Sequence, residues 1–342
     1  MTATAAGQPA ASLDDAELIA LAKADLHVHL VGSASPHTVA ALAARYPSAG
    51  VPASAAELRE FFRFRDFPHF LAVYTAVSSL VRTPEDVVTL VEGLATDMTA
   101  QGTAYAEVTV TPVSHLRAGI PPGELAQALS AGTAAARART GVELAWVYDI
   151  SGGDGPEGAR LTLDAALHHP PRDLIGFGLG GPEANVRRAD FAAEFAAARA
   201  AGLHSLPHAG ESTGAGEVWA AVEVLGAERV GHGIAAAADP RLLDHLRTRG
   251  ITLEICPSSN VATGVIPELA SHPLPRLLAA GVPVVLGSDD PPMFGTSLLE
   301  EYRRARDVLS LTGEQLRRLA RASIEASCAP PALKRRLAGA SA

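Results

Sequence analysis

Short apolar runs alternate along the chain with longer Ala- and Leu-rich segments, starting at about residue 25. The short runs have the β-branched and apolar composition of buried strands, and the longer segments have the 3.6-residue period of amphipathic helices. This alternation predicts repeated βα units around a parallel sheet. The predicted strands lie at 25–30, 105–111, 143–150, 174–180, 203–209, 229–232, 252–256 and 284–288. Eight strands close a barrel, so the predicted fold class is α/β, a (β/α)8 barrel of TIM type.

Helix start signals agree with this assignment. Pro36 opens one helix, residues 84–86 place a proline and two acids in a first turn, and Asp239-Pro240 starts another. The Ala-rich segments 188–200 and 214–225 should pack outside the sheet.

About 75 residues connect the first two predicted strands, which is far more than one helix needs. The surplus predicts an additional helical layer over the mouth of the barrel. Its aromatic stretch, residues 60–70, is expected mainly to form the core of that layer, and Tyr74 is the candidate to face a ligand.

Composition narrows the class of partner. The 342 residues are 48% hydrophobic, which is ample for a core, and the net charge is −9. An acidic chain is a poor match for nucleic acid or an anionic membrane, so a small molecule is the expected partner. The two cysteines, Cys256 and Cys328, are too few for a disulfide framework and favour a reducing cytoplasm.

The chain start lacks the features of a signal peptide, and no apolar stretch approaches the roughly 20 residues of a membrane span. Residues 1–12 are Ala-rich and are expected to fray, which leaves 13–342 as a single domain.

The first predicted strand carries two histidines, His27 and His29, at positions i and i+2. Side chains alternate faces along a strand, so both imidazoles project from the same side and can bind one metal ion. The alternative is a satisfied polar face of the strand. Three later motifs favour the metal, because each places similar groups at the end of its own strand.

These motifs are His-Ala-Gly-Glu, Gly-His-Gly and Ser-Asp-Asp-Pro. They supply His208 and Glu211, then His232, then Asp289 and Asp290. Adjacent carboxylates at a strand end repel each other unless a cation lies nearby. His204 lies at the other end of its strand and is expected to be structural.

A closed barrel brings these strand ends into one ring at its C-terminal face, whereas an open sheet would spread them along a line. Catalytic zinc takes nitrogen and oxygen ligands and leaves a position for water, whose pKa it lowers toward about 7. Three histidines and one aspartate would form such a site. An imidazole would then be left to deprotonate the water, and a glutamic acid to protonate the substrate.

In their order and strand positions these motifs resemble the adenosine deaminase family of the amidohydrolase superfamily, from about Lys23 to Met293. The resemblance implies a (β/α)8 barrel with one Zn²⁺ per chain and an aminohydrolase activity on a purine nucleoside. It implies that the metal ligands are His27, His29, His208 and Asp289.

The same resemblance implies roles for four further residues. Glu211 would protonate the purine N1, and His232 would position the attacking water at C6. Asp290 would bond the N7 edge of the ring. The backbone of Gly181 would approach N3, where a side chain would obstruct the ring.

One position departs from the family pattern. Adenosine deaminases have an aspartate that accepts a hydrogen bond from the ribose 5′-hydroxyl, and here that position is Val31. Valine cannot accept this bond, so we expect a substrate without a free 5′-hydroxyl.

The strings around Val31, Gly181 and Asp290 resemble the aminodeoxyfutalosine deaminases, whose substrate carries a 5′ chain ending in a benzoate and feeds menaquinone biosynthesis. A benzoate favours a guanidinium partner. The candidates from position alone are Arg63, Arg65 and Arg117. Asp149 is a candidate for bonding the ribose, with a helix N-cap as its alternative role.

Two other functions stay open at this point. The first is an adenosine or adenine deaminase of purine salvage, and the second is a nucleoside-binding protein without turnover. Metal identity and oligomeric state are not fixed by the sequence. Cys256 is expected to be packing, and a surface position is the default for the remaining histidines, namely His37, His69, His115, His168, His169, His245 and His272.

Overall fold

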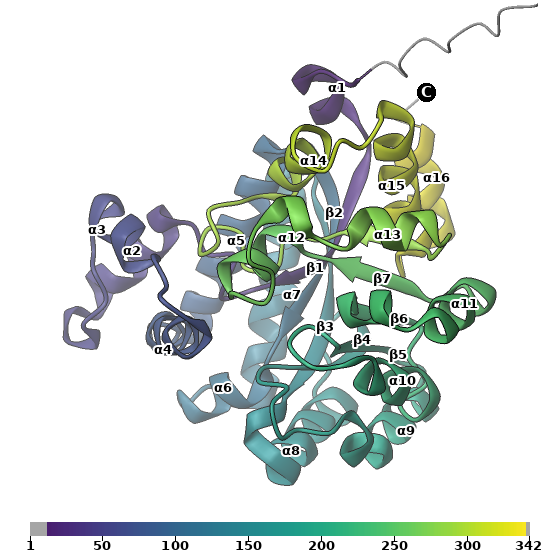
Figure 1. Ribbon diagram of the computed structural model, residues 1–342. Coiled ribbons are helices and arrows are strands. Elements are labelled where there is room, and N and C mark those ends of the chain that lie inside the picture. Colours follow the sequence, from purple (N-terminus) through teal and green to yellow (C-terminus); the bar gives the residue numbers. More distant parts are fainter. Residues whose placement is uncertain (1–11, 340–342) are drawn as a thin grey trace, which may run out of the picture.

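The computed structural model describes residues 12–339. Its sheet contains eight parallel strands in the order β1 to β8, each paired with the next. The strands are β1 (Lys23–His29), β2 (Thr103–Val110), β3 (Glu143–Ser151), β4 (Leu174–Gly180), β5 (His204–Ala209), β6 (Arg229–His232), β7 (Thr252–Ile255) and β8 (Val284–Leu286). All eight lie where the alternation of apolar runs predicts them, and they form a (β/α)8 barrel with helices around the outside (Figure 1).

The barrel closes between β1 and the segment just after β8. Val28 and Asp289 form an isolated parallel bridge, in which the His29 N–H donates to the Asp289 carbonyl over 3.0 Å. The Asp289 N–H donates in turn to the His27 carbonyl over 2.8 Å. Closure therefore fixes the His-x-His strand and the Asp-Asp pair against each other.

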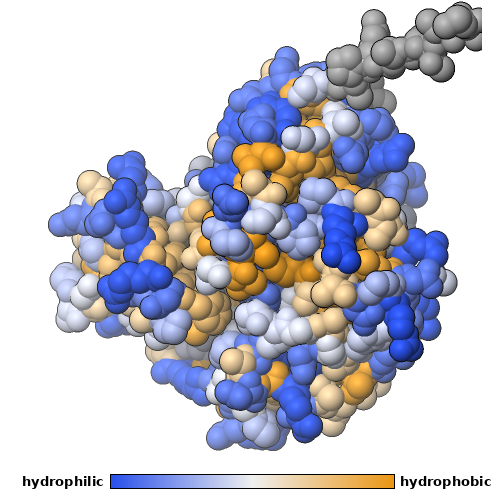
Figure 2. Space-filling view, in the orientation of Figure 1, coloured by the Kyte–Doolittle hydropathy of each residue, from blue (hydrophilic) through white to orange (hydrophobic). Residues whose placement is uncertain are grey.

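The long connection after β1 forms a helical insertion, as predicted. Its helices are α2 (Pro36–Arg45), η1 (Pro47–Ala49), α3 (Ala55–Phe61), α4 (Phe67–Ser78) and α5 (Pro84–Ala100). Helices α2, α3 and α4 project beside the barrel as a lobe (Figure 1). Figure 2 shows apolar side chains at the surface of the barrel beside this lobe.

Of the other helices, α1 precedes β1 and the rest follow the strands around the barrel. They are α1 (Asp15–Ala20), α6 (Pro112–Arg117), α7 (Pro122–Thr140), η2 (Gly152–Asp154), α8 (Gly155–His168), η3 (Arg188–Phe191), α9 (Ala192–Ala200), α10 (Ala215–Glu223), η4 (Ile234–Ala238), α11 (Pro240–Arg249), α12 (Pro257–Ala262), η5 (Leu269–Ser271), α13 (Leu274–Ala279), α14 (Leu298–Asp307), α15 (Gly313–Ala326) and α16 (Pro331–Gly339).

Local sequence explains where the predicted helices begin. Ser35, Thr83 and Asp239 each cap the backbone N–H groups of the first turn with a side-chain oxygen, directly before a proline. A side-chain acceptor at the cap and a proline with preset φ at the first helical position both favour a helix start.

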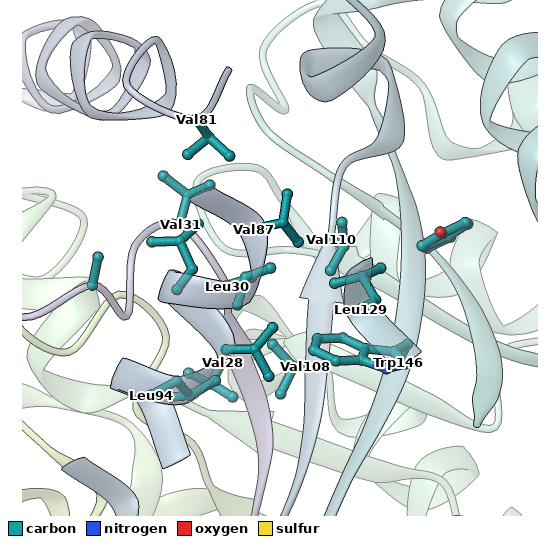
Figure 3. Packing of buried hydrophobic residues seen from close by; sticks show 14 of the residues in the cluster. Val28, Leu30, Val31, Val81, Val87, Leu94, Val108, Val110, Leu129 and Trp146 are labelled. Carbon is teal, nitrogen blue, oxygen red and sulfur yellow. The ribbon is translucent and has the colours of Figure 1, made fainter. Parts of the chain in front are cut away.

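One of three apolar clusters spans the first half of the barrel and the insertion. Its buried members include Val28 and Val108 from neighbouring strands, and Leu94 and Leu129 from helices that cover them (Figure 3). Val31 belongs to the same cluster, with a side chain that is 5% exposed.

One expectation changes. A surface position is wrong for His115 and His272, which are buried at 3% and 4% exposure. The segment predicted to fray, residues 1–12, lies outside the described residues except for Ser12, which is exposed and outside any helix or strand. The single domain over 13–342 stays a prediction. Among the described residues, no helix has both the length and the apolar character that a membrane span requires.

Candidate active site and metal centre

The C-terminal ends of the strands bring the predicted site residues together. His27 and His29 lie on β1, His208 on β5 and His232 on β6, and Asp289 follows β8. The ring centroid of His27 lies 4.4 Å from that of His208 and 4.7 Å from that of His232. Residues far apart in sequence therefore share one buried space at the rim of the barrel.

Three short separations connect the four predicted ligands. His29 Nε2 lies 3.2 Å from His208 Nε2 and 3.3 Å from Asp289 Oδ1, and His27 Nε2 lies 3.8 Å from the same Oδ1. Two ligands of a tetrahedral Zn²⁺ at about 2.0–2.1 Å lie about 3.3 Å apart. The two separations from His29 match this value, and the separation between His27 and Asp289 is longer.

One unpaired ring nitrogen and the protonation states of two residues also fit a metal site. His27 Nε2 is buried and has no hydrogen-bond partner in residues 12–339. Burial and the neighbouring charge of His27 hold the pKa of His208 well below its usual range, so this ring is neutral and able to ligate. Although burial opposes it, the nearby histidines lower the pKa of Asp289, which favours its carboxylate form. Three imidazoles and a carboxylate form a donor set that suits zinc.

Two other groupings of possible ligands overlap this one. Ligand atoms of His27, His208 and His232 lie within 4.8 Å of one another, and so do those of His27, Cys256 and Asp289. Burial raises the pKa of the Cys256 thiol well above its usual range, which disfavours the thiolate that binds metals. Packing therefore remains the better account of Cys256.

A buried charged layer beneath the ligands orients His27. Glu254 Oε2 lies 3.1 Å from His27 Nδ1, and its Oε1 accepts from Arg229 Nε over 2.6 Å. Arg229 also pairs with Glu107, whose side chain is fully buried. A carboxylate on one ring nitrogen directs the other toward the ligand cluster.

The Asn260 side-chain amide contacts His232 on its Nδ1 side. Asn260 Nδ2 lies 3.3 Å from His232 Nδ1, and its Oδ1 lies 3.2 Å from His272 Nε2. Burial and the charge of His27 lower the pKa of His232 to about 4, so the ring is neutral near pH 7. Its Nε2 lies 3.7 Å from Glu211 Oε2.

Two site residues have strained backbones. His232 has φ 58° and Asp289 has φ 63°, in the left-handed region that residues with a Cβ rarely adopt. Such conformations cost about 1–3 kcal/mol and persist where the surrounding structure imposes them. Both strained residues aim their side chains into the ligand cluster.

Two acidic side chains of the cavity, Glu211 and Asp290, have raised pKa values that favour their protonated forms. Burial, followed by the charge of Asp289, raises the pKa of Glu211 to about 8. Burial and the charges of Asp289 and Glu211 raise the pKa of Asp290 well above its usual range. A carboxylic acid with a raised pKa can donate a hydrogen bond or a proton near neutral pH.

Glycines make room for these groups. A Cβ on Gly32 would lie 1.5 Å from Asp290 Oδ1, and one on Gly231 would lie 2.7 Å from Cε1 of His27. Gly181 has φ 75°, and a Cβ there would lie 3.4 Å from the nearest side-chain atom. Gly32 and Gly231 are therefore required by space, whereas Gly181 is required by its backbone conformation.

A cavity of about 540 Å³ leads outward from these residues, within the usual size for small-molecule sites. Its inner end contains the cluster just described. Its walls include Phe70 and Tyr74 of α4 and Phe294. Phe70 stacks against Phe294 with ring centroids 5.0 Å apart. The insertion therefore forms one wall of the cavity.

The remaining predicted residues are placed as follows. Tyr74, Asp149 and Gly181 line the cavity. Asp149 lies within β3 and accepts from the Thr111 hydroxyl over 2.6 Å, rather than capping a helix. Val31 is absent from the cavity wall and belongs to the apolar cluster that also contains Leu30 and Val81 (Figure 3).

The three arginine candidates differ in whether they line the cavity. Arg117 lines the cavity and pairs with Asp154 over 2.6 Å. Arg63 and Arg65 do not line it, and Arg63 is 76% exposed in a pair with Glu60. Arg82, which sequence reasoning did not single out, also lines the cavity.

Glu254, Asn260 and Gly32 were likewise missed. Glu254 lies 227 residues from its partner His27 along the chain, and Asn260 lies 28 residues from His232. The Gly immediately after Val31 was the one available signal, because a glycine beside a ligand motif often marks a close approach.

Known proteins match this chain over most of its length. The profile of the adenosine deaminase family matches residues 22–340. An aminodeoxyfutalosine deaminase from Streptomyces coelicolor is 49% identical over 90% of this chain and 80% of its own. An adenine deaminase from Chelativorans sp. is 38% identical over 90% of this chain and 94% of its own.

Among solved structures, an adenine deaminase from Arthrobacter aurescens superposes with a TM-score of 0.88. It is 30% identical and covers 93% of this chain and 97% of its own. The family profile spans the barrel, the insertion and every residue of the ligand cluster. This chain belongs to the adenosine deaminase family.

Proposed function

We propose that the protein is a zinc-dependent aminohydrolase that converts 6-amino-6-deoxyfutalosine to futalosine and ammonia, a step of menaquinone biosynthesis. The observation that carries this proposal is that His29, His208, Asp289 and Glu211 line one cavity, where the pKa of Glu211 is raised to about 8. The high identity to an aminodeoxyfutalosine deaminase supports the choice of substrate. A cytoplasmic location is part of the same proposal.

The residues that would hold the zinc ion are His27, His29, His208 and Asp289. When bound, zinc would polarise a water molecule and lower its pKa toward about 7. The chain's own residues would do the rest of the chemistry.

Glu211 would donate its proton to the purine N1, which makes C6 more electrophilic. Its pKa of about 8 keeps that proton available near neutral pH. After the transfer, the carboxylate would lie 3.7 Å from His232 Nε2.

His232 would orient the attacking water and accept its proton. For Nε2 to accept, Nδ1 must carry the ring hydrogen and donate it to an amide oxygen. In the structure Asn260 instead turns its NH₂ group toward His232 and its amide oxygen toward His272 Nε2, whose Nδ1 accepts from the Leu274 N–H. Proton acceptance by His232 would therefore require both Asn260 and His272 to exchange their hydrogen bonds.

Asp290 and Gly181 would orient the purine. N7 of a purine is an acceptor, so it needs a donor, and a protonated Asp290 provides one. The buried Asp290 Oδ1 has no hydrogen-bond partner among the described residues and packs against Gly32. Gly181 would approach N3 with its backbone.

The direct test is ammonia release by the zinc-loaded protein from a panel of adenine, adenosine, methylthioadenosine, S-adenosylhomocysteine and 6-amino-6-deoxyfutalosine. We expect the highest kcat/KM for the last of these. A clear preference for adenosine or adenine would contradict the proposal and favour the second candidate, a purine-salvage deaminase, which the adenine deaminase relatives support.

Position 31 gives a second test. We expect Val31→Asp to lower activity on the 5′-substituted substrate relative to adenosine. Because Val31 is packed among apolar side chains, a carboxylate there would also destabilise the fold. Val51→Asp adds a carboxylate to the same cluster and controls for stability. An equal substrate ratio in both variants would show that position 31 does not select the substrate.

A further inference from the structure

Two exposed guanidinium groups line the cavity, and their exposure places them toward its open end rather than beside the buried ligand residues. Arg82 lies between α4 and α5, and Arg117 ends α6. Both line the cavity, together with Ser78, Ser79, Ser114 and Asp154. Arg82 is exposed and Arg117 has a side chain that is 62% exposed, so both are open to solvent. We call this set the outer end.

Arg82 is held in place before any ligand arrives. Its Nε–H donates to the Ser79 carbonyl over 2.8 Å, and its guanidinium carbon lies 4.5 Å above the centre of the Tyr46 ring. Its backbone N–H donates to Asp86 over 3.1 Å, and the Tyr46 hydroxyl donates to the same carboxylate over 2.7 Å. Asp86 is buried and therefore anchors both residues.

These contacts leave the two terminal NH₂ groups of Arg82 available to a ligand. Its two terminal NH₂ groups donate to no acceptor within residues 12–339, although the residue lines the cavity. Arg117 differs, because its NH1 is already 2.6 Å from Asp154. Of the two guanidinium groups, that of Arg82 is therefore the one with both terminal NH₂ groups available for a carboxylate.

We propose that Arg82 forms a carboxylate-binding subsite that recognises the benzoate at the end of the substrate's 5′ arm. This inference rests on the proposed function. A planar guanidinium pairs with a carboxylate through two parallel hydrogen bonds, and the Tyr46 platform fixes its plane. A group that is ordered in advance loses less conformational entropy on binding.

The location agrees with the chemistry of an extended substrate. The purine would lie at the inner end beside Glu211 and Asp290, and the aromatic wall of Phe70, Tyr74 and Phe294 lies along the same cavity. An arm from the ribose would follow this wall toward the outer end, where the chain carries positive charge despite its net charge of −9.

The experiment compares 6-amino-6-deoxyfutalosine with its benzoate methyl ester, which keeps the shape but removes the charge. For wild type we expect kcat/KM to be about 10- to 100-fold higher for the acid, since hydrogen bonds to a charged group are the strong ones. Arg82→Gln should bring the ratio close to one, mainly through KM for the acid. Arg82→Lys should give an intermediate ratio, because lysine keeps the charge but not the fork.

Two further variants serve as comparisons. Arg63→Gln removes an exposed guanidinium of the same insertion that does not line the cavity, and it should keep the wild-type ratio. Arg117→Gln should lower the ratio less than Arg82→Gln does. Calorimetric binding of futalosine and its methyl ester to the zinc-loaded proteins gives the same comparison without turnover.

A wild-type ratio retained in Arg82→Gln, or a ratio lost only in Arg117→Gln, would overturn the assignment while the proposed function stood. Wild-type protein that deaminates neither nucleoside would end both proposals. The two failures are therefore distinguishable.

Discussion

The inner and outer ends of the cavity are built from different parts of the fold. At the inner end, strand ends of the barrel present buried groups, such as His27 and His232, which are 2% and 1% exposed. At the outer end, the helical insertion and α6 present exposed side chains such as Arg82. The barrel can thus supply one reaction while the insertion varies the substrate.

The ends also differ in how their groups are restrained. The inner groups are fixed by buried polar partners and strained backbones, as in the His232–Asn260 contact and the φ of Asp289. Arg82 at the outer end is fixed by one carbonyl and one aromatic face, with its fork in solvent. Changes at the inner end should therefore affect chemistry and metal binding, and changes at the outer end should affect substrate affinity.

The largest effect is expected from Glu211→Gln. The amide keeps the shape but cannot transfer a proton, so kcat should fall by about 10²–10⁴-fold. Ammonia release measures the loss, and metal analysis should show the wild-type zinc content because Glu211 is not a proposed ligand. Near-normal turnover in this variant would contradict the proposed role of Glu211. If the wild-type protein binds the nucleoside but does not turn it over, the non-catalytic alternative is favoured.

Glu254→Gln should weaken zinc binding by about 10- to 100-fold, since it removes the carboxylate that orients His27. Competition with a chromogenic chelator measures this affinity. Glu228→Gln is the matched control, because the Glu228 side chain is 53% exposed and, among residues 12–339, its carboxylate pairs with His204 alone. Equal zinc affinity in the two variants would argue that His27 needs no carboxylate beneath it.

The pH profile tests whether the inner end depends on protonated acids. The pKa of Glu211 is about 8, so the group is protonated below that pH and loses its proton as the pH rises through it. We expect kcat/KM to fall about tenfold per pH unit above pH 8. Asp290 titrates in the same direction because its pKa is also raised. A rate that keeps rising above pH 8, at constant zinc content, would contradict this assignment.

The smallest effect is expected from Tyr74→Phe in the insertion wall. Loss of one neutral hydroxyl should raise KM about two- to tenfold without changing zinc content. Tyr302→Phe removes the hydroxyl of a buried tyrosine that does not line the cavity, and should leave KM unchanged. A large fall in kcat for Tyr74→Phe would contradict the expectation that the insertion affects substrate affinity rather than the chemical step.

The sequence by itself determined the barrel and most of the inner end. Apolar runs of strand length predicted all eight strands, because a parallel strand is buried on both faces. Parallel strands point their C-terminal ends to one rim, so the order of motifs such as His27-Val-His29 and Ser288-Asp-Asp290 was enough to place them together.

Only the tertiary structure decided which groups support that cluster and which face the substrate. Glu254 and Asn260 look like ordinary polar residues in sequence, and their roles depend on contacts with residues of other strands. Arg82 could not be told from Arg63 or Arg65, because whether a helical insertion turns a side chain toward a cavity depends on packing rather than on period. Local patterns fix which face of an element is buried, but long-range packing fixes what that face meets.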